Sequence, residues 1–154
     1  MTFFYLGVVY ADQSKLQIAI NAFRTALNLD SSLSFAYEEM GNLFKATKQY
    51  ERAIENYKLA KQGMSTLYKG LIDHRIALVY AETQNKTKMY DYLKSARREN
   101  AYYDRQVYND FIKAKEFQPY RLDKSFRRFT KSLLKTKKDN KFLNPELGWF
   151  RMRK

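Results

Sequence analysis

Apolar residues recur through the first hundred positions at intervals of three and four, which is the spacing of one face of an α-helix. Short polar stretches interrupt this pattern, at 12–14, 30–32, 47–49, 62–65 and 83–87. The pattern therefore predicts three helix–turn–helix hairpins, over about 2–29, 33–62 and 66–98. It also predicts two further helices, over about 102–117 and 123–137.

Polar residues at two of the breaks are expected to cap helices. Ser14 precedes the second helix of the first hairpin, and Asp30-Ser31-Ser32 precedes the second hairpin. Side-chain oxygens at such positions accept hydrogen bonds from the free backbone N–H groups of the first helical turn. We therefore expect N-caps at Ser14 and within 30–32.

One short motif occurs three times along the chain. Its copies are Leu6-Gly7-Val8-Val9-Tyr10, Met40-Gly41-Asn42-Leu43-Phe44 and Ile76-Ala77-Leu78-Val79-Tyr80, with a spacing of 34 and then 36 residues. Each has a large apolar residue, then Gly or Ala, then an aromatic residue. A fixed period in this range is typical of stacked helical hairpins. In the first copy we expect Leu6, Gly7 and Tyr10 to pack inside the hairpin and Val8 to face outward.

Small and large residues also recur in register in the second helices. The three columns are Ala19, Ala53 and Met89; Phe23, Tyr57 and Leu93; and Ala26, Ala60 and Ala96. Two helices approach within roughly 8–10 Å, and small residues at their contact allow the closest approach. Gly7 and Gly41 are poor helix formers, so close packing is the expected reason for them.

Together these columns resemble the tetratricopeptide repeat (TPR) family, whose unit is a 34-residue helix–turn–helix. The third copy departs from the family pattern, with Asp73 in an aromatic column and Met89 in the alanine column. The resemblance implies an all-α, right-handed α-solenoid of about three hairpins with C-terminal capping helices. We expect the array and its capping helix to occupy residues 1–118, and a basic helix and tail to occupy 119–154.

The resemblance also implies a concave groove, lined by the first helix of each hairpin, that binds a peptide or helix of another protein. The side chains expected to face this groove are Phe4, Val8, Ala11, Asp12, Glu38, Asn42, Lys45, His74, Arg75, Leu78 and Ala81.

Phe4 and Val8 leave two alternatives open. They favour an apolar partner segment, or they are covered by the chain's own tail or by a preceding repeat. One TPR subtype grips a peptide carboxylate with polar residues, and Asn42 and Arg75 lie at two of its positions. Phe4 and Val8 replace polar residues of that subtype, which argues against a carboxylate clamp.

Residues suited to catalysis or metal binding are scarce. His74 is the only histidine and cysteine is absent, which excludes Cys–His dyads, thiolate sites and multi-histidine metal sites. The sequence also lacks a glycine-rich phosphate loop. We therefore expect a non-enzymatic scaffold protein without catalytic residues, cofactor or metal.

Positive charge is concentrated in the second half of the chain. The formal net charge is +13; residues 1–77 hold nine basic and seven acidic residues, and residues 78–154 hold twenty and nine. In the predicted helix 123–137, Phe126, Phe129, Leu133 and Leu134 lie on one arc. The opposite arc carries Lys124, Arg127, Arg128, Lys131, Lys135 and Lys138.

Two functions fit this basic helix. It is either a capping helix with a solvated face or, as the alternative function, a binder of nucleic acid or an anionic membrane. Its aromatic residues lie on the arc expected to be buried, which counts against stacking on bases.

The C-terminal tail contains Trp149 and Phe150, which we expect to dock onto the array of the same chain or of a second copy, so that a homo-oligomer is one outcome. The apolar stretch 3–11 follows no basic residue and is far shorter than the roughly 20 residues of a membrane span. We expect a cytoplasmic protein, with export or a place in a longer protein left open.

Overall fold

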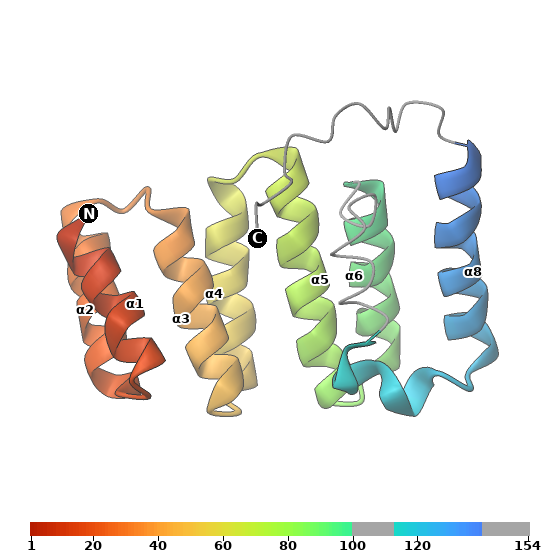
Figure 1. Ribbon diagram of the computed structural model, residues 1–154, viewed down its shortest axis with the longest axis horizontal. Helices are drawn as coiled ribbons and strands as arrows, with labels where there is room; N and C mark the ends of the chain where they lie inside the picture. Colours follow the sequence, from red (N-terminus) through yellow and green to blue (C-terminus); the bar gives the residue numbers. More distant parts are fainter. Residues whose placement is uncertain (100–112, 140–154) are drawn as a thin grey trace, which may run out of the picture. The chain divides into compact units, whose positions relative to one another are not determined.

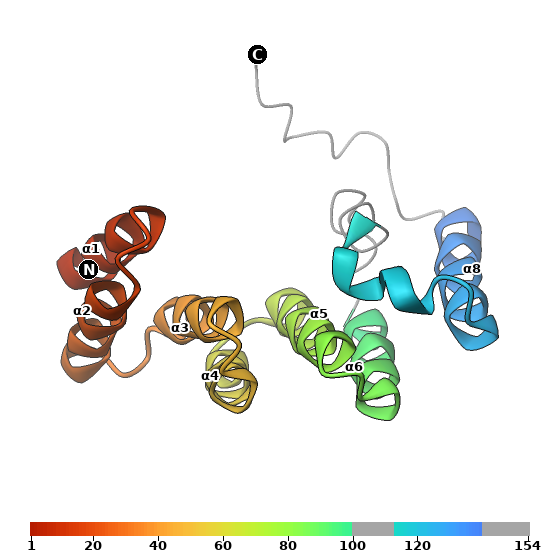
Figure 2. The same cartoon turned by 90° about the horizontal axis from the view of Figure 1, so that it is seen from below.

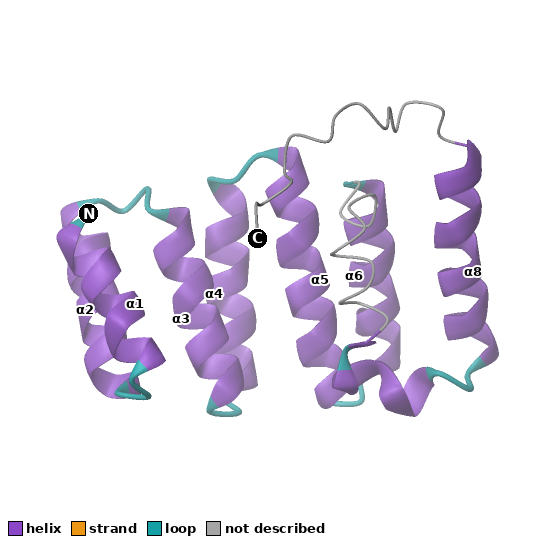
Figure 3. Ribbon diagram, viewed as in Figure 1, coloured by secondary structure: helices purple, strands orange, loops and turns teal. Residues whose placement is uncertain are grey.

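The computed structural model describes residues 1–99 and 113–139, and every regular element in these ranges is helical (Figures 1 and 3). In chain order the elements are α1 (Thr2–Asp12), α2 (Leu16–Leu29), α3 (Ser34–Ala46), α4 (Tyr50–Gln62), α5 (Thr66–Glu82), α6 (Lys86–Arg98), the 3-10 helix η2 (Lys115–Tyr120) and α8 (Lys124–Asp139). The three predicted hairpins are confirmed to within one residue at each end. None of the described helices is long and apolar enough to cross a bilayer.

The chain divides into two compact units, one formed by residues 1–117 and one that begins at residue 118. In the first unit, α1 packs on α2, α3 on α4, and α5 on α6, and successive pairs meet through α2–α3 and α4–α5. Helices α1, α3 and α5 lie in one layer and their partners in the other (Figure 2). This arrangement is an α-solenoid of helical hairpins, as predicted.

The repeated columns of the second helices form the core of the array. All nine of their residues are at most 3% exposed. A Cβ on Gly7 would lie 2.6 Å from the Phe23 ring, and one on Gly41 would lie 2.6 Å from the Tyr57 ring. Since real Cβ atoms do not approach ring carbons so closely, the glycines let each first helix rest on an aromatic ring of the second.

The two extra residues before the third motif lengthen a helix rather than a loop. Helix α5 has 17 residues, whereas α3 has 13. Asp73, the departure from the aromatic column, lies within α5 and is fully buried. Lys61 of α4 donates to both of its carboxylate oxygens at 2.7 Å, so an ion pair takes the place of an aromatic contact between these helices.

The three hairpin turns share one backbone conformation. Their left-handed residues are Ser14, Lys48 and Gln84, with φ between 58° and 59°. In each turn the next residue donates its N–H to a carbonyl five residues earlier, at 2.8–2.9 Å: Lys15 to Tyr10, Gln49 to Phe44 and Asn85 to Tyr80. This is the hydrogen bond that closes a Schellman motif, which normally has glycine at the left-handed position.

Both predicted N-caps are wrong. Ser14 is taken up by the left-handed turn, and α2 begins after Lys15 without a side-chain cap. Asp30 Oδ1 instead accepts hydrogen bonds from the backbone N and the Oγ of Ser32, at 2.9 and 2.6 Å, so these residues stabilise their own turn. A side-chain cap is present at Asn85, whose Oδ1 accepts from Lys88 N at 3.1 Å.

The helix predicted over 102–117 lies largely outside the described residues. Of its described residues, Lys113 is α-helical, whereas Lys115–Tyr120 form the 3-10 helix η2. Pro119 lies within η2, where it lacks an N–H group and disfavours the α conformation at Gln118. In the second unit, α8 begins at Lys124, where Asp123 Oδ1 accepts from the backbone N of Ser125 and of Phe126 at 2.8 and 3.1 Å.

Candidate partner-binding groove

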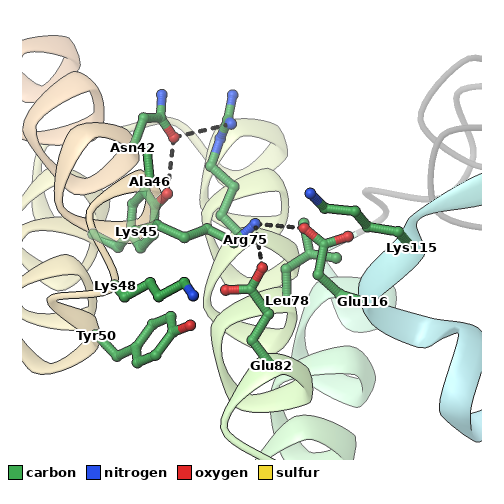
Figure 4. A pocket seen from close by; sticks show the side chains of 11 residues that line it. Asn42, Lys45, Ala46, Lys48, Tyr50, Arg75, Leu78, Glu82, Lys115 and Glu116 are labelled. Atoms are coloured by element: carbon green, nitrogen blue, oxygen red, sulfur yellow. Dashed lines mark hydrogen bonds and ion pairs between the residues drawn. The ribbon is translucent and has the colours of Figure 1, made fainter.

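The first helices of the second and third hairpins border a hollow of about 410 Å³ (Figure 4). Its lining residues are Asn42, Lys45 and Ala46 of α3; Lys48 of the following turn; Tyr50 and Tyr57 of α4; Arg75, Leu78 and Glu82 of α5; and Lys115 and Glu116 of η2. The hollow thus brings together four of the predicted groove residues, Asn42, Lys45, Arg75 and Leu78. Hereafter "the groove" means this hollow and its lining.

Lys45 links three segments of the groove wall. Its Nζ lies 2.5 Å from Glu116 Oε1 and 3.6 Å from Glu82 Oε1, so one ammonium joins α3 to η2 and to α5. Burial alone would raise the pKa of Glu116, but the hydrogen bond from Lys45 and the nearby Lys115 hold it below its usual range. Glu116 is therefore charged at neutral pH, and the ammonium of Lys45 is held by this carboxylate and by that of Glu82.

A second network joins α3, α4 and α5. Arg75 Nη2 lies 2.8 Å from Glu38 Oε1, and its Nη1 donates to Asn42 Oδ1 at 3.2 Å. The Tyr57 hydroxyl donates to the same Asn42 oxygen at 2.8 Å. Burial raises the pKa of Glu38, and Arg75 opposes this shift. Since the carbonyl oxygen of Asn42 accepts two hydrogen bonds within the protein, this residue braces the wall of the groove.

Two cations of the groove remain open to a partner. Lys48 and Lys115 are exposed, and among the described residues neither forms a salt bridge. Arg75 and Lys45 are already paired with carboxylates. The groove consequently presents positive charge beside the apolar side chain of Leu78. In the described part of the chain, no cluster of acidic residues and histidine is arranged to hold a metal ion.

The prediction that His74 faces an open groove is wrong. Its side chain is buried, and its ring centroid lies 6.0 Å from that of Phe117 in η2. Burial, reinforced by the charge of Arg75, lowers the pKa of His74 to about 4, so the imidazole is neutral at pH 7. Ala81 is also buried. Glu38, which occupies the column of His74 in the second hairpin, is buried to the same extent.

The predicted groove residues of α1 do not line the hollow. Phe4 and Val8 are half-buried and pack against the hydrophobic core, with the Phe4 ring centroid 5.8 Å from that of Phe23. Asp12 is exposed at the end of α1. Leu6, expected to pack inside the hairpin, is 38% exposed instead. The prediction was thus wrong for Leu6 and Val8, whereas Gly7 and Tyr10 pack inside the hairpin as expected.

Sequence reasoning missed six polar residues of the lining: Lys48, Tyr50, Tyr57, Glu82, Lys115 and Glu116. Glu82 lies one turn beyond Leu78 on the same side of α5, so extending the predicted stripe would have included it. Lys115 and Glu116 carried no such signal, because their place depends on how η2 packs beside α5.

Helix α8 presents the expected two faces along its described side chains. Phe126, Phe129 and Leu133 are buried, whereas Lys124, Arg127, Arg128 and Lys131 are exposed. The side chains of Leu134, Lys135 and Lys138 lie outside the described residues, as do Trp149 and Phe150 with their predicted docking.

Neither a protein-family model nor a curated protein matches the chain. Among solved structures, the crystal structure of MamA is similar, with a TM-score of 0.60 and 21% sequence identity. The match covers 64% of this chain and 56% of the MamA chain, so it spans little more than half of that protein. At this identity the likeness concerns the fold. Because MamA is a TPR-like helical repeat protein, the match and the repeat columns together indicate a TPR-type repeat fold.

Proposed function

We propose that this protein is a non-enzymatic interaction module that holds a segment of another protein in the groove. The observation that carries the proposal is the hollow of about 410 Å³ along α3 and α5, the helices whose counterparts in TPR-type arrays line the concave side. The two polar networks hold its walls in place before a partner arrives, which lowers the cost of ordering on binding.

The chemistry of the groove favours an acidic partner segment with an apolar anchor. Lys48 and Lys115 supply the open positive charges. Phe35 and Tyr68 form an exposed edge-to-face pair with ring centroids 5.7 Å apart. Each lies two helical turns before a groove residue, Phe35 before Asn42 and Tyr68 before Arg75, and therefore on the same side of its helix. An extended peptide could contact the aromatic pair with an apolar side chain and the lysines with carboxylates.

Fluorescence anisotropy with a panel of labelled peptides tests this proposal. The panel holds extended peptides with two acidic residues and one Phe or Leu, and the same peptides with the acidic residues amidated. We expect the acidic peptides to bind, and the double variant Lys48→Glu, Lys115→Glu to weaken binding at least roughly tenfold. The matched control is Lys58→Glu, Lys94→Glu, which makes the same charge change at exposed positions on α4 and α6. The proposal would be contradicted if both double variants lost the same affinity, or if the amidated peptides bound as tightly as the acidic ones.

The exposed basic face of α8 favours a second candidate function, binding to an anionic surface. Four cations, Lys124, Arg127, Arg128 and Lys131, project from a helix whose apolar side chains are buried. Association with anionic vesicles or with double-stranded DNA should then weaken steeply as salt rises, and should weaken further in the triple variant Arg127→Gln, Arg128→Gln, Lys131→Gln. Absent or salt-insensitive binding would remove this candidate.

A further inference from the structure

The surface between α3 and α5 changes in character along the two helices. In their first turns, Phe35 and Tyr68 are 50% and 44% exposed, and their rings are in contact. In the middle, Arg75 of α5 bridges to Glu38 and Asn42 of α3. The two helices run in the same direction (Figure 1), so the aromatic pair lies at one end of this surface and the hollow lies toward the other.

The aromatic pair and the hollow occupy the same side of each helix. Residues three, four and seven positions apart share one side of an α-helix. Steps of this size connect Phe35 to the hollow on α3, through Asn42 and Lys45, and Tyr68 to the hollow on α5, through Arg75, Leu78 and Glu82. The two stripes therefore form one continuous surface that is aromatic at one end and cationic at the other.

Helix geometry gives the distance between these two ends. At a rise of 1.5 Å per residue, about 15 Å separate Phe35 from Lys45 on α3, and the same holds for Tyr68 and Leu78 on α5. The open cation Lys48 follows three residues after Lys45. An acidic group bound there thus lies about 15–20 Å from the ring pair, which an extended chain spans with about five or six residues and an α-helix with about ten to thirteen.

The direction of the partner's side chains narrows this separation to about six residues. Both anchoring side chains must leave the peptide on the side that faces the groove. Every second side chain points the same way in a β-strand, and every third does so in a polyproline II segment. Six residues satisfy both conditions and span about 19–20 Å in either conformation.

We propose that the groove binds one extended segment through two anchors, an apolar side chain on Phe35 and Tyr68 and an acidic side chain about six positions away, beside Lys48 and Lys115. This inference rests on the proposed function, and it adds the conformation of the partner and the spacing of its anchors. The acidic anchor passes over the middle of the surface because the guanidinium of Arg75 is already paired with Glu38.

Peptides of identical composition test the spacing by fluorescence anisotropy. Each has one Phe and two adjacent Asp residues, with the nearer Asp six or two positions from the Phe, and a spacer rich in Pro and Ser. Both orders of the anchors are made, and the tighter order is compared at each spacing. The six-position peptide should bind at least roughly fivefold more tightly, because two positions span only about 7 Å and reach one anchor site at a time. A spacer of α-aminoisobutyrate, which enforces a helix, shortens six positions to about 9 Å and should cause the same loss.

Variants of the protein show whether both anchors are bound at once. Tyr68→Ser and Lys115→Glu should each weaken the six-position peptide by at least roughly fivefold. Neither should weaken the two-position peptide by more than about twofold, because that peptide can still bind through the remaining site. The control Leu59→Ser changes a residue of α4 that is 37% exposed and should affect neither peptide. Circular dichroism melting checks folding, which exchanges of exposed side chains should preserve.

The outcomes separate this inference from the proposed function. Equal affinity at both spacings, tighter binding at two positions, or undiminished binding with the helical spacer would overturn the two-anchor inference, while binding of acidic peptides would still support the proposed function. If no acidic peptide binds at either spacing, both are overturned.

Discussion

Replacing Gly41 with alanine should destabilise the protein although alanine is the better helix former. In the middle of α3 the exchange would gain about 1 kcal/mol of helix propensity. The new methyl group, however, would lie 2.6 Å from two carbon atoms of the Tyr57 ring. That ring is 1% exposed and its hydroxyl is hydrogen-bonded to Asn42, so it cannot move aside freely. Such overpacking costs about 1–3 kcal/mol, and the strong overlap places this site at the upper end.

The expected net loss is about 1–2 kcal/mol in the free energy of unfolding, or about 3–6 °C in melting temperature for a chain of this size. Urea unfolding followed by far-ultraviolet circular dichroism at neutral pH measures it. Gly7→Ala should behave in the same way, because its Cβ would lie 2.6 Å from the Phe23 ring.

The third hairpin indicates which second substitution should relieve the overlap. It has Ala77 and Leu93 where the second hairpin has Gly41 and Tyr57. In a Tyr57→Leu background, Gly41→Ala should therefore be neutral or stabilising by up to about 1 kcal/mol. The double-mutant cycle then shows a coupling of about 1–3 kcal/mol between the two sites. If Gly41→Ala stabilises the wild type, or costs the same in both backgrounds, the steric explanation of the glycine column is refuted.

Urea unfolding also checks three other predictions. Gln84→Gly should stabilise the chain by about 0.5–1 kcal/mol, because glycine removes the strain of a left-handed residue at φ 58°; no gain would show that the turn is unstrained. Asp73→Asn should cost about 2–4 kcal/mol, since it leaves Lys61 without its fully buried carboxylate partner; a loss below about 0.5 kcal/mol would contradict this. His74 has a pKa of about 4 in the folded chain, below the 6.5 of an unperturbed histidine, so protonation favours the unfolded chain. Stability should fall by about 1.4 kcal/mol per pH unit as pH drops below 6.5 toward 4, and His74→Gln should flatten the slope in that window.

The hairpins could be predicted from the sequence because the residue pattern that specifies each hairpin lies within the hairpin itself. Helical spacing gave the element boundaries, and the register of the columns showed which side of each helix faces its own partner. The close approach at Gly7 and Gly41 followed from the same columns. The N-caps could be predicted less well, because Ser14 is of a residue type that is typical of N-caps and yet occupies a left-handed turn. Side-chain type alone does not distinguish these two uses of a polar residue at a helix break.

Only the part of the groove lining that lies on α3 and α5 could be predicted, because the rest depends on contacts between distant segments. Asn42, Lys45, Arg75 and Leu78 follow from their columns on α3 and α5, and the structure gathers them around one hollow. The wall formed by Lys115 and Glu116 depends on a contact between segments about 70 residues apart, such as the ion pair of Lys45 with Glu116. No periodicity within a hairpin encodes such a contact. The pairing of Lys45 and Arg75 with carboxylates also leaves Lys48 and Lys115 as the open cations of the groove, which the columns do not encode.

The errors at Leu6 and His74 have one physical cause. A column states which side of its own hairpin a residue occupies, but its burial depends on the next element along the stack. His74 is buried with Phe117 of η2 against it, and Glu38 of the same column is buried as well, so the column is covered in both hairpins. Leu6 belongs to a column that is buried in the later hairpins and is exposed because no described helix packs on α1 as α2 packs on α3. In a solenoid, then, a residue such as Leu6, whose exposure departs from the rest of its column, marks a side on which no described helix is stacked.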